Sequence, residues 1–450
     1  MIVEKLELEN FRGFEQAEIE FDKRLNVFIG GNGAGKTSIL EAIVKCLNAR
    51  IHPFTNDSTF YPLTLDDINY KHLFAAINTS ISYPLVFKET SPIPLYAGPE
   101  DIQNESLIFS NLEKRKQLAN EEIDTFIDLI TYNNTVIPIV KFYPTNRNAI
   151  TYSSNGTSKM YSIAQIETWE NIKHNNTSYS SFLNWFFENE TKELRFKRDQ
   201  EDFKVELPYL KAVRFVINKA FQQLHKKDFL IKSNQFKRTG SNDLIPTIVL
   251  QDKETKQELD VNSLSDGEKT ILTLISDIAY NLSIANPEGK TTDEILGSKG
   301  IVLIDEIDAH LHPTWQREIV PLLLDLFPSI QFFVTTHSPQ IIASIKSEQV
   351  FICDNFKVSQ LKFKTKGLDS NTILRHVFNS TDRPKEYQVL LAKFDELIEK
   401  QAAIEEIEAV LSEITKKEKE DMQLDVSQLE SELELRLEAY KFDLEHEENN

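Results

Sequence analysis

The chain is poor in cysteine, lacks a long apolar run and has no basic segment at its start. Cys46 and Cys353 are its two cysteines, too few for a disulfide framework or a cysteine-ligated metal site. No apolar stretch approaches the roughly 18 residues that span a bilayer. The first residues lack the basic and apolar regions of a signal peptide. These absences predict a protein of the reducing cytoplasm.

Basic residues are also outnumbered, with 50 Lys and Arg against 70 Asp and Glu and a net charge of −20. Residues 384–450 contain 20 acidic and 8 basic residues, so they carry −12 of this charge. Nucleic-acid binding depends on clustered Lys and Arg that contact phosphates. The composition therefore argues against DNA as the main ligand, although a local basic groove or a partner could hold a nucleic acid.

Apolar spacing predicts an α/β body followed by charged helices. Strand patterns occupy residues 2–8, 19–21, 25–29, 81–88, 135–142, 244–250, 301–304 and 331–335, and the turn before Leu259 indicates that 244–250 begins a β-hairpin. Helical patterns occupy residues 37–47, 182–193, 208–224, 265–282, 315–326, 386–414 and 424–444. Short apolar strands joined by helices imply a doubly wound parallel sheet.

The strongest motif lies between an apolar strand and a helix and reads Gly30-Gly31-Asn32-Gly33-Ala34-Gly35-Lys36-Thr37. It matches the phosphate-binding loop pattern G-x-x-x-x-G-K-[ST]. Its glycines let backbone N–H groups converge on phosphates, and the following helix adds its positive end. Lys36 is expected to reach the β- and γ-phosphates, and Thr37 to ligate Mg²⁺. Further contacts to ATP are expected from Asn32, Gly33, Ala34, Gly35 and Ser38.

Two carboxylates end a second apolar strand, in the order Ile301-Val302-Leu303-Ile304-Asp305-Glu306. In enzymes with a phosphate-binding loop, the first carboxylate holds Mg²⁺ and the second polarises the attacking water. Asp305 is therefore a candidate metal ligand and Glu306 a candidate catalytic residue.

Two further segments indicate the ATPase class. Leu264-Ser265-Asp266-Gly267-Glu268 resembles the signature of ATP-binding-cassette (ABC) ATPases, although taken alone it reads as a capped helix start. His337 follows the strand after Glu306, where these ATPases keep a histidine that contacts the γ-phosphate, although a lone histidine is more often structural. The order of all four elements favours the ATPase reading, with Lys36, Glu306 and His337 as the catalytic set.

The start of the chain, Asn10-Phe11-Arg12-Gly13-Phe14, resembles the RecF, SMC and OLD group of cassette ATPases. Within that group the chain is most similar to PtuA, the family of ATPase subunits from Septu antiphage defence systems, which also occurs beside some retrons. The resemblance covers residues 1–383 and includes residues 142–147, 305–316 and 335–340. The acidic helices after residue 374 are similar as well.

The resemblance implies an ABC-type head with a mainly parallel sheet, an antiparallel β lobe, a helical insertion and an all-helical C-terminal extension. The expected divisions are residues 1–150, 151–230, 231–383 and 384–450. Cassette heads dimerise head to tail, so Ser265, Asp266 and Gly267 of one chain would meet the γ-phosphate held by the other. Arg12 is expected to lie near the nucleotide.

The resemblance also implies partners: a second copy of the chain, an HNH endonuclease called PtuB, and a retron reverse transcriptase with its nucleic acid. The acidic terminal helices would be a docking or self-association surface, or only a solvated hairpin.

Some positions depart from the family pattern. The glutamine of the family's Q-loop is not evident, and the region of Arg147 is the proposed counterpart. Asp266 replaces a glycine, and His312 stands where many relatives carry an aspartate. His310 and His312 could form a metal pair, but loop residues at a dimer junction are the favoured interpretation.

Three functions remain open. About 228 residues separate Lys36 from the signature, too few for the long paired helices of an SMC protein. The 113 residues after His337 lack the acidic strand pattern of a Toprim nuclease, so no nuclease centre is expected. The chain is predicted to be an ATPase switch that restrains a separate nuclease. The alternatives are a RecF-like ATPase that clamps DNA directly and a nucleotide sensor with little turnover.

Overall fold

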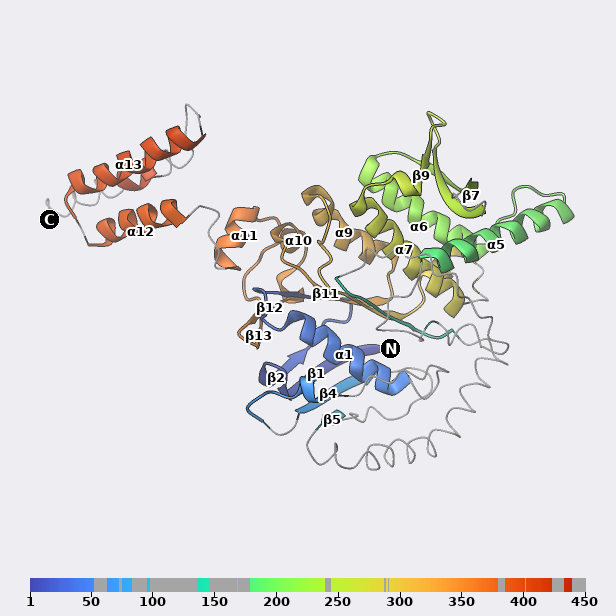
Figure 1. The fold of residues 1–450 in the computed structure, drawn as a ribbon, viewed down its shortest axis with the longest axis horizontal. Coiled ribbons are helices and arrows are strands. Elements are labelled where there is room, and N and C mark those ends of the chain that lie inside the picture. The colour runs from blue at the N-terminus through green and yellow to red at the C-terminus, as the bar shows by residue number, and fades with distance from the viewer. Residues whose placement is uncertain are drawn as a thin grey trace. The chain divides into compact units, whose positions relative to one another are not determined.

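The computed structural model describes residues 1–51, 63–72, 75–82, 95–97, 136–145, 168, 179–238, 244–286, 289, 291–378, 385–400, 402–422 and 433–438. The chain divides into two compact units, Met1–Ser370 and Asn371–Asn450 (Figure 1). The four-part division expected from the sequence stays a prediction. Among the described helices, none combines the length and apolar character that crossing a membrane requires.

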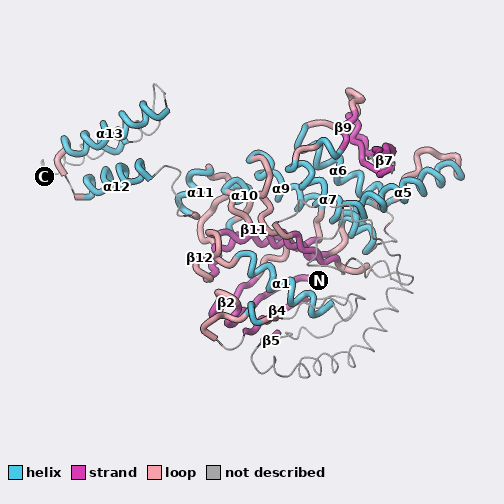
Figure 2. The backbone as a smooth tube through the Cα atoms, viewed as in Figure 1, coloured by secondary structure: helices cyan, strands magenta, loops and turns pink. Residues whose placement is uncertain are grey.

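A six-stranded sheet forms the centre of the first unit, and Figure 2 shows its strands β11 and β12 in magenta. Its neighbours pair in parallel except for the last two strands, which are antiparallel. Every residue of β3, β6, β10 and β11 is buried, which explains their continuous apolar runs. The order is β6 (Ile139–Tyr143), β10 (Gly300–Ile304), β11 (Ile330–Thr335), β3 (Leu25–Ile29), β12 (Val350–Asp354) and β13 (Lys357–Gln360).

An antiparallel sheet forms the lobe predicted at the start of the chain. Its strands run in the order β2 (Phe14–Glu20), β1 (Ile2–Phe11), β4 (Ala75–Ser82) and β5 (Leu95–Ala97). Helix α1 (Lys36–Ile51) packs against β4 of this lobe and β11 of the central sheet, so it lies between the two sheets (Figure 1). The strand predicted at 81–88 begins earlier than expected, and positions 83–88 lie outside the described residues.

Helices cover the other face of the central sheet (Figure 1). α7 packs on β6, and α6 packs on α7, α8 and α9. The bounds are α5 (Tyr179–Asp199), α6 (Pro208–His225), α7 (Asp266–Ala285), α8 (Thr292–Leu296), α9 (Pro313–Leu326) and α10 (Pro339–Ser344). The short 3-10 turns are η2 (Leu65–Asp67), η3 (Val261–Ser263) and η4 (Ser347–Gln349). These helices and the sheet confirm the predicted α/β class, with a mainly parallel sheet and an antiparallel lobe.

Four of the described strands, β5, β7, β12 and β13, were not predicted. β7 (Phe229–Arg238) joins β8 (Leu244–Asp252) and β9 (Glu258–Asp260) in a small antiparallel sheet. β12 and β13 extend the central sheet beyond the expected strands. Their side chains alternate between buried and exposed only in part, so no clear period marks them in the sequence.

The second unit begins within α11 (Ser370–His376) and consists of helices in the described residues. The prediction of one helix over residues 386–414 was wrong: α12 (Lys385–Glu399) and α13 (Ile404–Met422) are separate. The break lets the two helices share a core, because the apolar face of one then packs on the other. That core contains Phe394, Ile407, Val410, Ile414, Leu433 and Leu437.

Candidate nucleotide-binding site

The glycine-rich loop connects β3 to α1, as its motif predicts. Gly33 and Gly35 have φ values of +76° and +100°, which glycine adopts without steric cost. A Cβ at Gly35 would lie 2.7 Å from the ring of Phe14. Lys36 Nζ donates to the carbonyl oxygens of Gly30 and Gly31, both at 2.9 Å. The loop therefore has the backbone that a phosphate group requires, with its lysine held against it.

Asp305 lies at the carboxyl end of β10 and accepts hydrogen bonds from three hydroxyl groups. Thr37 Oγ1 lies 3.0 Å from Oδ2, Thr145 Oγ1 lies 3.0 Å from Oδ2, and Thr335 Oγ1 lies 2.5 Å from Oδ1. All these donors and acceptors are oxygen, the ligand type that Mg²⁺ prefers. The residues present therefore fit a magnesium ion held by Thr37 and Asp305.

Glu306 adopts a left-handed backbone conformation, with φ of +47°. A non-glycine residue in this region is strained, and such strain is concentrated at functional sites. Its backbone N–H donates to Thr335 Oγ1 at 2.7 Å. The same hydroxyl donates to Asp305, so Thr335 orients both acidic residues.

His337 follows β11 and is half-buried. Burial lowers the pKa of His337, and the Lys36 ammonium adds to this effect. The imidazole is consequently neutral at pH 7 and has one N–H to donate. Burial also lowers the pKa of Lys36, against the opposing effect of Asp305 and Glu306.

Arg12 belongs to a charged network at the edge of α1. Its Nε donates to Asp67 Oδ1 at 3.0 Å, Nη2 to Glu41 Oε2 at 2.5 Å and Nη1 to Ser38 Oγ at 3.3 Å. Lys45 Nζ lies 2.8 Å from Asp67 Oδ2. Although burial raises the pKa of Asp67, bonds from Lys45 and from the backbone keep it below its usual value. Asp67 thus fixes Arg12 beside Ser38.

These elements enclose one pocket of about 490 Å³, within the size range of small-molecule sites. It brings together most of the residues predicted from the phosphate loop, the paired carboxylates and the histidine after β11, but none from the signature. Ala34 is absent from its lining, whereas Gly13 and Phe356 were not predicted. The lining consists of Arg12, Gly13, Asn32, Gly33, Gly35, Lys36, Thr37, Ser38, Asp305, Glu306, His337 and Phe356. Their roles remain predictions.

The signature residues lie elsewhere, at the start of α7. Ser265 is the N-cap, and its hydroxyl and backbone N–H donate to Glu268 Oε2 at 2.6 and 2.7 Å. His225 Nε2 lies 2.8 Å from the other oxygen of Glu268. Ser265 and Asp266 are exposed and do not line the described pocket. The capped helix start predicted as the plainer alternative is therefore present.

Gly267 brings the start of α7 against the loop that follows Glu306. A Cβ at this position would lie 2.6 Å from the carbonyl oxygen of His310. His310 and His312 are both exposed, and His312 Nδ1 accepts from the backbone of α9. In the part of the chain that the structure describes, no group of three or more His, Cys, Asp or Glu residues could hold a metal. His310 and His312 are thus exposed at the same surface as the start of α7.

The proposed Q-loop counterpart near Arg147 lies outside the described residues. Thr145, two positions earlier, contacts Asp305 instead, and sequence reasoning did not assign it a role. Thr145 follows a strand as Asp305 does, and that position was the available signal. That position identifies Thr145 as a partner of Asp305 only once β6 and β10 are known to be neighbours in the sheet.

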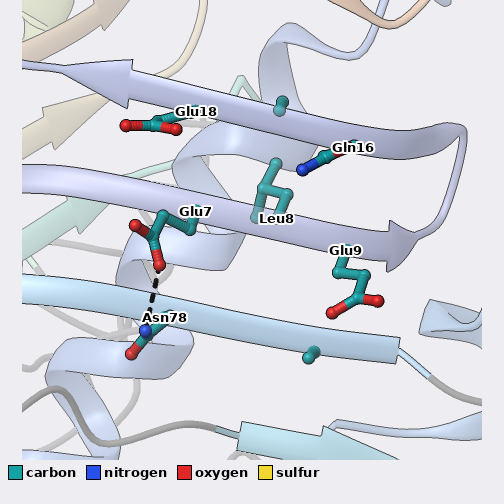
Figure 3. A pocket seen from close by; sticks show the side chains of 8 residues that line it. Glu7, Leu8, Glu9, Gln16, Glu18 and Asn78 are labelled. Atoms are coloured by element: carbon teal, nitrogen blue, oxygen red, sulfur yellow. Dashed lines mark hydrogen bonds between the residues drawn. The ribbon is translucent and has the colours of Figure 1, made fainter.

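A second hollow lies on the antiparallel sheet, and Figure 3 shows its acidic lining. Glu7, Glu9 and Glu18 surround it, and Glu7 accepts a 3.0 Å hydrogen bond from Asn78 Nδ2. Lys5 Nζ pairs with Glu7 at 2.7 Å and with Glu18 at 2.6 Å, and the excess of carboxylates makes this hollow an unfavourable site for phosphates.

Comparisons with known proteins give a family and several relatives. A family model described as "AAA domain, putative AbiEii toxin, Type IV TA system" matches residues 25–343. The chain is 28% identical to the "Retron Ec83 probable ATPase" of Escherichia coli, over 88% of this chain and 80% of that protein. It is 22% identical to the "Septu protein PtuA" of Bacillus thuringiensis, over 76% of this chain and 73% of that protein. Among solved structures, an SMC head bound to the C-winged helix domain of ScpA is 14% identical, with a TM-score of 0.45, over 81% of this chain and 98% of that chain.

Proposed function

The chain belongs to the AAA-domain family whose model matches residues 25–343, an ATPase family, and we propose that it binds Mg-ATP between two copies of its head to control a partner nuclease. One observation carries this proposal. The phosphate loop, the two carboxylates and His337 line one pocket, whereas Ser265 and Asp266 are exposed outside it. A signature that acts on a nucleotide must therefore reach it from a second copy.

Within one head, the triphosphate would bind to the backbone N–H groups of the loop and to Lys36. Thr37 and Asp305 would hold Mg²⁺, which neutralises phosphate charge when bound. The three hydroxyls around Asp305 favour this role, because they keep the carboxylate oriented toward Thr37.

Hydrolysis of ATP to ADP and phosphate would use Glu306 and His337. Glu306 would polarise the attacking water, since its strained backbone carries the side chain out of the sheet and into the pocket. His337, neutral at pH 7, would donate one N–H to the γ-phosphate. Lys36 would stabilise the charge that develops on the transferred group.

The second copy would supply the start of its α7. This end carries the positive pole of a 20-residue helix, which attracts a phosphate. Ser265 and Asp266 face solvent, and the buried Gly267 lets the adjoining His310 loop share that surface. A head-to-tail dimer would place this surface over the pocket of the other copy.

The proposed partners follow from the relatives, which are named as a Septu protein and as retron ATPases. An HNH nuclease of the PtuB kind would be the effector, and a retron reverse transcriptase with its nucleic acid would be a further component. The helices α12 and α13 would dock the nuclease. We place this assembly in the cytoplasm, where the buried thiols of Cys46 and Cys353, neither in a disulfide, stay reduced.

The other functions have less support. A direct DNA clamp needs a basic surface, but the hollow on the antiparallel sheet is acidic. A sensor with little turnover would not need the strained Glu306 beside Asp305.

Two inactive variants, mixed, test the two-copy arrangement. Lys36→Ala removes the loop lysine, and Ser265→Ala removes the signature hydroxyl. A mixed dimer would retain one intact site, so a 1:1 mixture should recover roughly a quarter of wild-type ATPase activity. If the mixture stays as inactive as either variant, the signature does not act across a dimer.

Co-purification from the native operon, with and without ATP, tests the partner. A stoichiometric HNH nuclease in the complex would support the switch. Recovery of nucleic acid without a nuclease would instead favour the DNA clamp.

A further inference from the structure

Phe356 occupies a turn that favours glycine. Asp354 pairs with Lys357, so Asn355 and Phe356 form a two-residue connection between β12 and β13. Both residues are left-handed, with φ values of +45° and +59°. Such turns prefer Asn-Gly, because the second residue must tolerate positive φ. A bulky aromatic residue there is an outlier, so the turn itself does not account for phenylalanine.

The ring of Phe356 packs so closely against Gly13 and Gly35 that neither position has room for a side chain. A Cβ at Gly13 would lie 2.2 Å from the ring of Phe356, and a Cβ at Gly35 would lie 2.9 Å from it. Phe14, which is fully buried, meets Phe356 edge-on, with ring centroids 5.4 Å apart and planes at 82°. Phe356 is thus oriented on one side by packing.

The rest of the ring lines the nucleotide pocket. Phe356 remains half-buried and borders the pocket next to Gly13 and Arg12. Arg12 in turn donates to Ser38, one residue beyond the magnesium ligand Thr37. The other pocket groups are charged, hydroxyl-bearing, amide or glycine residues and the imidazole of His337, which suit a triphosphate and a metal ion. Phe356 is the residue of this lining that carries an apolar aromatic ring.

We propose that Phe356 contacts the base of the bound nucleotide and so gives the pocket its preference for a nucleoside triphosphate over a bare polyphosphate. An aromatic ring binds a nucleobase by stacking, whereas it gains nothing from phosphate oxygens. The strained turn is then retained for binding rather than for folding. This inference rests on the proposed function, because the loop must hold the triphosphate for the base to reach the ring.

Binding of two ligands to the full chain tests it: ATP and inorganic tripolyphosphate, each with Mg²⁺, by isothermal titration calorimetry. Phe356→Gly supplies the Asn-Gly turn and removes the ring, and Phe356→Tyr keeps an aromatic face as the matched control. In Phe356→Gly the dissociation constant for ATP should rise about tenfold, while that for tripolyphosphate stays unchanged. Phe356→Tyr should bind both as the wild type does.

The other outcomes contradict the base contact. If Phe356→Gly weakens the binding of ATP and of tripolyphosphate equally, the ring only supports the phosphate loop. If it weakens neither, the base lies elsewhere, and the proposed function survives because the wild type still binds both. Absence of binding by the wild type would refute the proposed function together with this inference. Melting curves of both variants confirm that each is folded during the titration.

Discussion

The hydroxyl of Tyr143 donates a 2.6 Å hydrogen bond to Oδ2 of Asp277. This bond joins the last residue of β6 to the middle of α7, the helix that begins with the signature. Burial raises the pKa of Asp277, although Lys141 and Tyr143 oppose the shift. The carbonyl oxygen of Tyr143 also accepts from the backbone N–H of Asp305. One residue therefore connects Asp305, the candidate metal ligand, to the helix that begins with the signature.

Tyr143→Phe should lower the free energy of unfolding by about 1–3 kcal/mol, because a buried carboxyl group loses a hydrogen-bond donor. Urea denaturation measures the change. Tyr70→Phe is the control, since Tyr70 is 89% exposed and its hydroxyl stays hydrated. Equal stability of the two variants would show that the bond contributes nothing.

Lys36→Ala should abolish Mg-ATP binding while leaving the fold intact. The amine is the cation nearest to the loop carbonyls, and its loss removes the charge that the phosphates require. Calorimetric titration gives the affinity, and Lys253→Ala, on an exposed turn, serves as the control. Wild-type affinity in the Lys36 variant would contradict the assignment of the loop.

Glu306→Gln should trap an ATP-bound dimer. The amide keeps the shape of the side chain but cannot accept the proton of the attacking water. Light scattering after size exclusion should show a dimer with Mg-ATP and a stoichiometric amount of unhydrolysed nucleotide. Glu254→Gln, on a surface turn, should behave like the wild type. Unchanged turnover in Glu306→Gln would remove this residue from catalysis.

His337 should titrate below 6.5, its usual value. Because the folded pKa is depressed, the unfolded chain takes up the proton first as the pH falls. Stability is therefore lost below pH 6.5 and unaffected by His337 above it. Histidine NMR signals, assigned with His337→Gln, give the midpoint. In Lys36→Ala the midpoint of the His337 titration should rise, because a nearby cation is gone. A midpoint above 6.5 in the wild type would contradict the lowered pKa of His337.

Deletion of residues 384–450 should leave ATP binding intact but reduce partner docking. The deleted helices have their own apolar core, so the first unit keeps its packing. ATP affinity and nuclease co-purification are the two measurements. A full-length variant, Val389→Ser with Leu435→Ser, alters two apolar side chains that are 67% and 66% exposed, without removing a helix. If the deletion leaves both assembly and nuclease binding unchanged, the C-terminal helices have no docking role.

Local motifs could be predicted because their chemistry is contained in a few consecutive residues. The loop ending at Lys36 and the strand ending at Asp305 both carry their structural context beside them, an apolar strand and a helix. The same reasoning failed for residues 386–414, where helical propensity continues across the break between α12 and α13. Only the packing of Phe394 against Ile407 and its neighbours requires the chain to turn there.

The sequence by itself determined the class of the protein, the phosphate loop, the paired carboxylates and the strands that present them. These depend on short-range periodicity and on residue types at fixed spacing. The tertiary structure decided which of these elements meet. It placed Thr145 and Thr335 on Asp305, Phe356 in the pocket and Ser265 outside it. Such contacts depend on which strands become neighbours in the sheet, and that order arises from burial over the whole chain rather than from any local pattern.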